Sequence, residues 1–196
     1  MKKIVVFCGS SLGFNPIYKH AAIELGDYFV NNDITLVYGG GKIGMMGVLS
    51  ESILKKGGKV IGVIPNLLKK EEVVNKNVTE LIITKTMSER KVMMSKLTDG
   101  YISLPGGFGT LDELFEGLTL GQLHIEKKPN GILNTNGFFN HTLKQLDHMV
   151  SEGYLKKENK EMLLVGNNVS ELMLKMDTYI APKKSTVINK IIKHDH

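Results

Sequence analysis

Short runs of apolar, mostly β-branched residues recur along the chain, and each is closed by glycine, proline or polar residues. Runs of this length and composition are typical of strands that are buried on both faces of a parallel sheet. The clearest examples are Ile4-Val5-Val6-Phe7 and Val60-Ile61-Gly62-Val63-Ile64. We expect strands at residues 3–8, 34–38, 60–64, 81–84, 100–104 and 131–133, with a further one at 162–165.

Longer stretches lie between these runs, and their apolar residues recur every three to four positions, as Ala22, Leu25 and Phe29 do. This spacing is the period of a helix with one buried face. We expect helices at residues 16–31, 44–56, 88–98, 111–124, 140–152 and 170–179, with Asn140 and Ser170 as N-caps.

The alternation of strands and helices predicts βαβ units and therefore an α/β fold. We expect a Rossmann-like, doubly wound parallel sheet of six to seven strands with helices on both faces. A length of 196 residues fits one such sheet. We therefore expect a single domain over residues 1–180, followed by a polar C-terminal extension at residues 181–196.

The amino-acid composition restricts the kinds of partner that this chain can have. The 25 basic and 20 acidic residues give a net charge of +5, which suits an anionic ligand but is too small an excess for a nucleic-acid-binding protein. The lone cysteine, Cys8, follows an apolar run and indicates a buried thiol in a reducing compartment. The sequence has neither a signal peptide nor an apolar stretch of about 18 residues. We expect a cytoplasmic protein with no membrane partner and no nucleic-acid partner.

Three glycine-rich segments follow predicted strands, at the sheet edge where open parallel sheets bind ligands. They are Cys8-Gly9-Ser10-Ser11-Leu12-Gly13, Tyr38-Gly39-Gly40-Gly41-Lys42-Ile43-Gly44 and Leu104-Pro105-Gly106-Gly107-Phe108-Gly109-Thr110. Glycine allows a positive φ and a close approach to a ligand, and a following helix offers free N–H groups to an anion. For the first two segments a tight turn between strand and helix explains the glycines equally well, because neither has the spacing of a dinucleotide-binding loop.

The third segment indicates a phosphate site more directly, because its glycines run into Thr110 and a predicted helix. However, Thr110-Leu111-Asp112-Glu113 also matches a capping box, in which Glu113 would only bond to the N-cap amide. The sequence leaves both interpretations open. If Glu113 faces the ligand, it would lie one helical turn beyond the phosphate, at a depth where a ribose ring could sit. A carboxylate in that position would suit the stabilisation of an oxocarbenium-like transition state.

Arg90 and Lys91 begin the predicted helix after the fourth strand, at the same end of the sheet. Cations are unfavourable at a helix N-terminus, so this pair indicates binding of an anion or a base edge. The six histidines show neither His-x-x-x-His spacing nor an association with cysteine, so we expect no metal site. Ser10 lacks the G-x-S-x-G context of a serine nucleophile.

Two of these segments match a known family. Pro105-Gly106-Gly107-Phe108-Gly109-Thr110-Leu111-Asp112-Glu113 fits the motif P-G-G-x-G-T-x-x-E, and Met87-Ser88-Glu89-Arg90-Lys91 fits M-x-x-R-K. With further matches between residues 3 and 180, the sequence resembles the Lonely Guy (LOG) family of cytokinin riboside 5′-monophosphate phosphoribohydrolases. Members are often labelled lysine decarboxylases, but nothing here suggests a pyridoxal phosphate lysine in its usual setting.

The resemblance implies hydrolysis of the N-glycosidic bond of a purine nucleoside 5′-monophosphate, with AMP and its N6-prenylated forms as the leading substrates. The products would be the free base and ribose 5-phosphate, with no cofactor needed. The resemblance also implies that Arg90 and Glu113 are catalytic, and that the protein is a homodimer with its active site near the subunit interface. The expected substrate-binding residues are Gly9, Ser10, Glu72, Met87, Lys91, Gly106, Gly107, Phe108, Gly109, Thr110 and Thr119.

The chain departs from the family pattern just after Thr119. Leu120-Gly121-Gln122 replaces a more usual tryptophan-containing stretch, and His124 and Glu126 stand where other residues are commoner. These departures bear on base selectivity more than on the reaction. Two alternatives remain: a nucleotide-binding or sensing protein without turnover, and a transferase that uses the same phosphate cradle.

Overall fold

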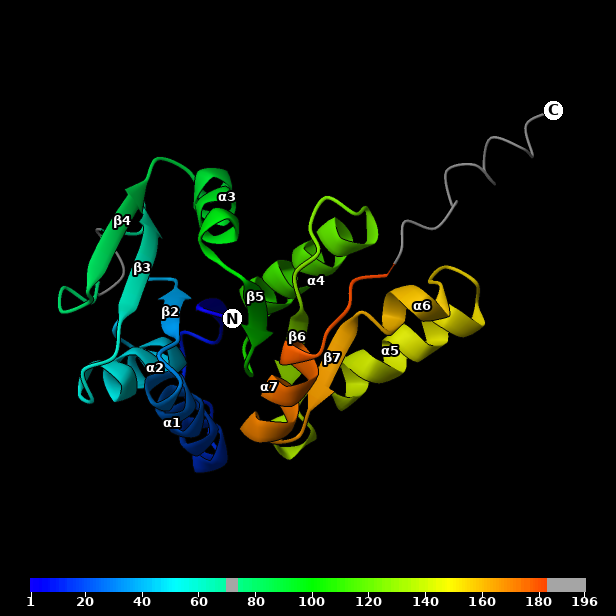
Figure 1. Ribbon diagram of the computed structural model, residues 1–196, viewed down its shortest axis with the longest axis horizontal. Helices are drawn as coiled ribbons and strands as arrows, with labels where there is room; N and C mark the ends of the chain where they lie inside the picture. Colours follow the sequence, from blue (N-terminus) through cyan, green and yellow to red (C-terminus); the bar gives the residue numbers. More distant parts are fainter. Residues whose placement is uncertain (70–73, 183–196) are drawn as a thin grey trace.

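The computed structural model describes residues 1–69 and 74–182, so residues 183–196 of the predicted C-terminal extension lie outside the described residues. A parallel sheet of seven strands forms the centre, in the order β4-β3-β2-β1-β5-β6-β7 (Figure 1). The strands are β1 (Lys3–Phe7), β2 (Thr35–Tyr38), β3 (Val60–Pro65), β4 (Glu80–Thr84), β5 (Gly100–Ser103), β6 (Asn130–Leu133) and β7 (Leu163–Gly166). The predicted strands and the parallel α/β fold are confirmed.

The predicted helices are also present; α1 has the predicted bounds, and the ends of the others differ from the predicted ones by at most three residues. They are α1 (Pro16–Asn31), α2 (Gly44–Leu54), α3 (Met87–Leu97), α4 (Phe108–Gln122), α5 (Asn140–Ser151) and α7 (Val169–Asp177). Two short elements were not predicted, the 3-10 helix η1 (Thr135–Gly137) and α6 (Lys157–Lys160), because neither is long enough to show a helical period. Across the described residues, no helix has the length and apolar character needed to cross a membrane.

Both predicted N-caps are wrong. Helix α5 follows Phe139, and Asn140 instead accepts a hydrogen bond from the Asn134 side chain at 2.8 Å. Helix α7 is capped by Asn168, whose side chain accepts from the Glu171 N–H at 2.9 Å. A polar residue satisfies the free N–H groups only where the chain enters the helix, and the entry points are set by the packing of the preceding segments.

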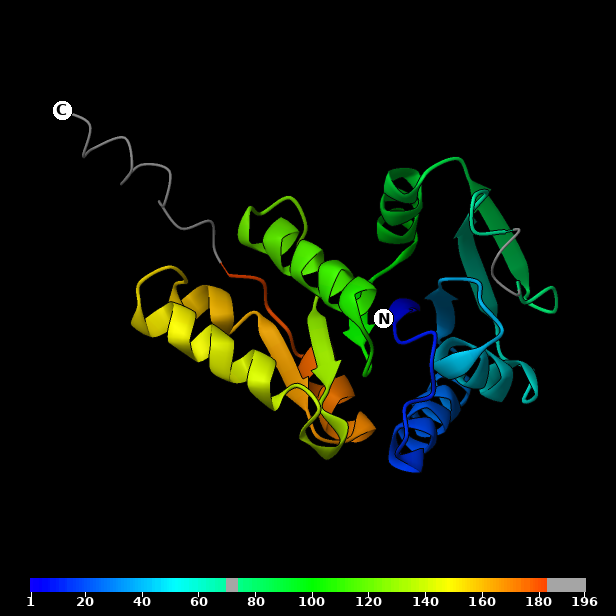
Figure 2. The same cartoon turned by 180° about the vertical axis from the view of Figure 1, so that it is seen from behind.

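The helices form two layers, one on each face of the sheet (Figures 1 and 2). Successive strand residues point to opposite faces, so in β1 Ile4 and Val6 join a core cluster built with α1, α2 and α7. Val5 and Phe7 join a second cluster that includes Met94 of α3. Helices α4 and α5 cover the same face further along the sheet. The strands are thus buried on both sides, as their apolar runs predict.

The strand order reverses at β1, which pairs with β2 on one side and β5 on the other. The chain builds outward from β1 to β4 and then returns to β5, so the loops after β1 and β5 lead into helices on opposite faces. Ligands bind at such a switch point. The two loops touch here, since the Gly9 N–H donates to the Pro105 carbonyl at 3.1 Å.

The close approach of the two loops leaves no room for a side chain at Gly106. A Cβ atom at Gly106 would lie 2.1 Å from the Thr110 hydroxyl oxygen and 2.8 Å from the Gly9 nitrogen. Glycine is therefore required at this position for packing rather than for a special φ.

Candidate active site

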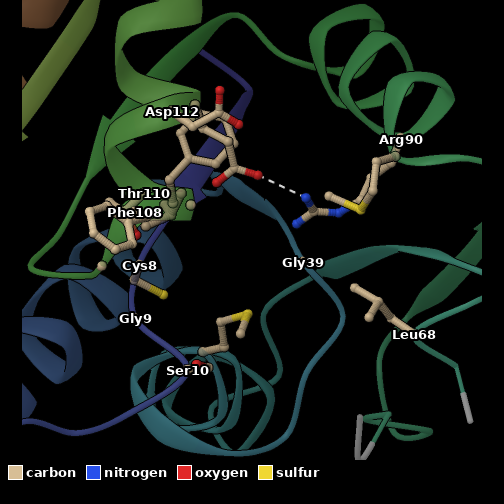
Figure 3. A pocket seen from close by; sticks show the side chains of 16 residues that line it. Cys8, Gly9, Ser10, Gly39, Leu68, Arg90, Phe108, Thr110 and Asp112 are labelled. Atoms are coloured by element: carbon tan, nitrogen blue, oxygen red, sulfur yellow. Dashed lines mark hydrogen bonds and ion pairs between the residues drawn. The ribbon is translucent and has the colours of Figure 1, made fainter. Parts of the chain in front are cut away.

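A pocket of about 330 Å³ opens at the carboxyl ends of β1, β2 and β5 (Figure 3), a size within the usual range for small-molecule sites. The predicted site residues that line it are Gly9, Ser10, Met87, Arg90, Gly107, Phe108, Gly109, Thr110 and Glu113. These residues come from three separate segments, the loop after β1, the start of α3 and the start of α4, which meet in one place. The lining residues absent from the predicted site are Val6, Phe7, Cys8, Gly39, Met46, Leu68 and Asp112.

The N-terminus of α4 forms one wall of this pocket. Its N-cap is Gly107, which offers no side chain to the helix, and the first turn carries no acidic residue. A Cβ atom at Gly107 or Gly109 would meet nothing within 4 Å, so the backbone there faces open space. The free N–H groups of this turn and the helix dipole together favour an anion.

The capping-box interpretation of Thr110-Leu111-Asp112-Glu113 is wrong. Helix α4 begins at Phe108, so Thr110 already lies inside the helix and cannot be its N-cap. The Glu113 side chain turns to α3 instead of to the start of its own helix. The sequence motif matched, but the helix starts three residues earlier than the motif requires.

Arg90 and Glu113 form a buried ion pair across the pocket. The Arg90 Nη1 donates to Glu113 Oε1 at 2.8 Å, and its Nε donates to the Val63 carbonyl of β3 at 3.1 Å. Each side chain is only 11% exposed. Figure 3 shows Arg90 extending from α3 towards the carboxylate on α4. The guanidinium is thus held by two elements at once, in a fixed position over the pocket.

Gly39 provides the space that this guanidinium occupies. A Cβ atom at Gly39 would lie 2.8 Å from Arg90 Nη2 and 3.0 Å from the Met46 sulfur. The neighbouring Gly40 has a φ of +80°, and its carbonyl accepts from the Asn75 N–H at 2.9 Å. Gly40 thus makes a tight turn, as one interpretation of the second segment predicts, whereas Gly39 makes room for a side chain of the protein.

The ionisation of the pocket follows from its burial. Burial raises the pKa of Glu113 above its ordinary value of 4.5, and the positive charge of Arg90 opposes this shift. Burial also raises the pKa of the Cys8 thiol to about 12, with a smaller contribution from the negative charge of Glu113. Cys8 is therefore a neutral thiol at physiological pH and is unsuited to nucleophilic attack.

Three of the predicted site residues that the structure describes do not line this pocket, and a fourth, Glu72, lies outside the described residues. Lys91 bridges Asp112 and Glu116 of α4, at 2.8 and 2.7 Å. Thr119 is exposed, and its hydroxyl donates to the Phe115 carbonyl at 2.7 Å. The third is Gly106, which lines a neighbouring cavity.

The described part of the chain has no group of side chains that could form a metal centre. Within residues 1–69 and 74–182, no three His, Cys, Asp or Glu side chains are grouped so that they could hold a metal ion. The charged side chains that line the pocket form ion pairs, Arg90 with Glu113 and Asp112 with Lys91.

Known proteins resemble this chain over most of its length. A family model described as "Possible lysine decarboxylase" matches residues 46–176. The cytokinin riboside 5′-monophosphate phosphoribohydrolase LOG1 of Arabidopsis thaliana is 43% identical over 189 residues, which are 96% of this chain and 88% of that protein. This chain belongs to the LOG family. A second LOG protein, the cytokinin riboside 5′-monophosphate phosphoribohydrolase LOG of Oryza sativa subsp. japonica, is 43% identical over 91% of this chain and 74% of its own length.

The LOG fold also extends to more distant proteins. The solved structure of the molybdenum cofactor binding protein from the phototrophic bacterium Rippkaea orientalis superposes with a TM-score of 0.66. It is 21% identical and covers 98% of each chain. Likeness at this level of identity concerns the architecture alone.

Proposed function

We propose that this LOG-family chain hydrolyses the N-glycosidic bond of purine nucleoside 5′-monophosphates, including N6-modified AMP, and releases the free base and ribose 5-phosphate. The observation that carries this proposal is the buried Arg90–Glu113 pair beside the open N-terminus of α4. The names of the relatives at 43% identity support the same reaction.

The arrangement along α4 suits a nucleotide. The 5′-phosphate would bind at residues 107–110, where free N–H groups face the pocket. A helix advances 1.5 Å per residue, so Glu113 lies about 6 Å beyond Gly109 along the axis. This spacing would bring the carboxylate beside the ribose when the phosphate occupies the helix N-terminus.

The chemistry requires one anionic and one cationic group. As the bond from C1′ to the base nitrogen breaks, its electron pair leaves with the base and positive charge develops at C1′. The Glu113 carboxylate would stabilise that charge and accept a proton from the water that adds to C1′. The leaving base takes up one proton from solvent, and Glu113 returns the proton of the attacking water to solvent. The net reaction therefore consumes one water molecule, and the protons balance. Arg90 would keep Glu113 ionised and offset negative charge on the base or the phosphate.

A direct assay tests this proposal. Purified protein is incubated with AMP or N6-isopentenyl AMP, and the released base and ribose 5-phosphate are separated by chromatography. We expect Glu113→Gln to lower kcat by about 100-fold or more, whereas Glu24→Gln, on the exposed surface of α1, should behave as wild type. Nucleotide binding by the wild type without any release of base would contradict hydrolysis and favour a sensing role.

We also propose that residues 1–180 form a single hydrolase domain that acts as a homodimer in the cytoplasm. Val92 of α3 and Leu123 and Ile125 after α4 are 53%, 58% and 66% exposed, and exposed apolar residues of this kind favour a subunit interface. All three lie on or next to the helices that carry the ion pair. The single cysteine cannot form an internal disulfide. Since disulfides are rare in cytosolic proteins, this supports a cytoplasmic location.

A further inference from the structure

A buried polar cluster lies next to the second glycine-rich segment, outside the active-site pocket. Asn75, between β3 and β4, is 4% exposed, and its Nδ2 donates to the Ser50 hydroxyl of α2 at 3.2 Å. The Tyr38 hydroxyl, at the end of β2, is buried beside both side chains. None of the three residues lines the pocket. Since buried polar groups are costly unless they bond to one another, the cluster fixes the segments from which it is built.

The main chain around Asn75 holds the second glycine-rich segment in place. The Asn75 N–H donates to the Gly40 carbonyl at 2.9 Å, and Val74 forms an antiparallel bridge with Gly41. The Asn75 Oδ1 accepts from the Asn77 N–H at 3.1 Å, which fixes the orientation of the amide. Asn75 thus binds the glycine-rich segment through its backbone and α2 through its side chain.

Residues 39–41 in turn limit where the Arg90 guanidinium can lie. The Nε and Nη1 atoms are bonded to the Val63 carbonyl and the Glu113 carboxylate. The Nη2 atom lies against Gly39, where a Cβ atom would approach it to 2.8 Å, and Figure 3 shows the end of the Arg90 side chain close to Gly39. A shift of this segment would release or displace Nη2, and a misplacement of about 1 Å at a reacting group can lower a rate about 100-fold.

We propose that Asn75 is a positioning residue for the reaction, which keeps the Arg90 guanidinium aimed into the pocket by holding residues 39–41 in place. Asn75 does not line the pocket, so it acts through this segment and not on the ligand. The inference rests on the proposed function, because it takes the role of Arg90 in the reaction from it.

Two buried asparagines provide a matched test. Asn75→Ala removes the bond to α2. Asn134→Ala removes an asparagine that is 7% exposed, bonds within the segment after β6 and does not line the pocket. Both changes leave buried polar groups without a partner and should lower the melting temperature. With kcat/KM for AMP referred to the folded protein, we expect a loss of about tenfold in Asn75→Ala and a value close to wild type in Asn134→Ala. Equal values in the two variants would overturn the positioning role.

A double-mutant cycle tests whether the effect passes through Arg90. Arg90→Lys keeps a positive charge but has no Nη2 atom. The loss caused by Asn75→Ala should therefore shrink from about tenfold to less than about twofold in the Arg90→Lys background. A purely structural role would lower kcat/KM by the same factor in both backgrounds, and that result would overturn the proposal. If Asn75→Ala does not fold, Ser50→Ala takes its place, because it removes only the hydroxyl that accepts from Asn75 and should give a smaller loss in the same direction.

A spectroscopic measurement separates this inference from the proposed reaction. Arg90 is the only arginine in the chain, so its Nε–H group gives a single NMR signal in protein labelled with nitrogen-15 arginine. The signal reports on the guanidinium in the free protein, without substrate. We expect it to shift or broaden in Asn75→Ala and to keep its wild-type position in Asn134→Ala. If the wild type releases no base from any nucleotide, hydrolysis fails as the function, but this shift would still support the link from Asn75 to Arg90. A wild-type signal in Asn75→Ala would overturn it.

Discussion

At the scale of single residues, the pairing of Arg90 with Glu113 predicts the pH dependence of the reaction. Burial raises the pKa of Glu113 above 4.5, and Arg90 opposes the shift. The active carboxylate forms only above that raised pKa, so the acid limb of kcat/KM against pH should lie above 4.5. Arg90→Gln removes the opposing charge and should move the limb to still higher pH. A limb at or below pH 4.5 in the wild type would contradict this assignment.

Gly39 gives a second prediction at the residue scale. A methyl group there would meet Arg90 Nη2 at 2.8 Å, although the backbone of Gly39 does not have a positive φ. We expect Gly39→Ala to fold normally but to displace the guanidinium and lower kcat/KM about tenfold, the size of one disturbed charge-assisted hydrogen bond. In the Arg90→Lys background, which has no Nη2 atom, the same change should have little further effect. Additive losses in this double-mutant cycle would show that Gly39 acts independently of Arg90.

At the scale of elements, α4 carries both the proposed phosphate site and the Glu113 carboxylate. Gly109 lies in its first turn with open space in front of it. An acidic residue in the first turn stabilises a helix by about 0.3–1 kcal/mol, yet at this place it would repel a phosphate. We therefore expect Gly109→Asp to keep or raise the melting temperature while it raises the KM for AMP more than about tenfold. Gly109→Ala adds a methyl group without charge and is the matched control, and equal KM values for the two variants would argue against phosphate at this turn.

Helix α3 contacts α4 through ion pairs. Arg90 and Lys91 are adjacent in sequence, and both pair with carboxylates of α4. The Arg90 pair is buried, whereas Asp112 and Glu116, the partners of Lys91, are 61% and 41% exposed. The buried pair thus has the fixed position that chemistry requires, whereas the more exposed pairs of Lys91 contribute little to stability.

At the scale of the whole molecule, the switch point between β1 and β5 brings the proposed phosphate site and the Arg90–Glu113 ion pair together. The exposed apolar residues near α3 and α4 predict how two such molecules associate. We expect Val92→Glu to shift the sedimentation coefficient from that of a dimer to that of a monomer. Leu174→Glu places the same charge on α7, at a residue that is 66% exposed on the other layer of helices, and should leave the dimer intact. A wild type that sediments as a monomer would contradict the proposed dimer.

The fold was readable from the sequence because it depends on local periodicity. The strand residues are continuous apolar runs since both sheet faces are covered, and the helices show a three-to-four spacing since each has one buried face. The glycine-rich segments could be placed at one edge because the carboxyl ends of parallel strands meet there. The N-caps and the start of α4 were missed because several polar residues near each end can serve as a cap, and packing selects among them.

The sequence by itself therefore determined the architecture and the edge of the sheet at which the site lies. Only the tertiary structure decided which side chains meet there. Arg90 and Glu113 are 23 positions apart, and their pairing depends on how α3 and α4 lie across the sheet. The close approach of Gly39 to the Arg90 guanidinium likewise depends on a distance between segments that no local pattern records. Periodicity encodes which face of an element is buried, whereas a site is made of side chains that converge through space.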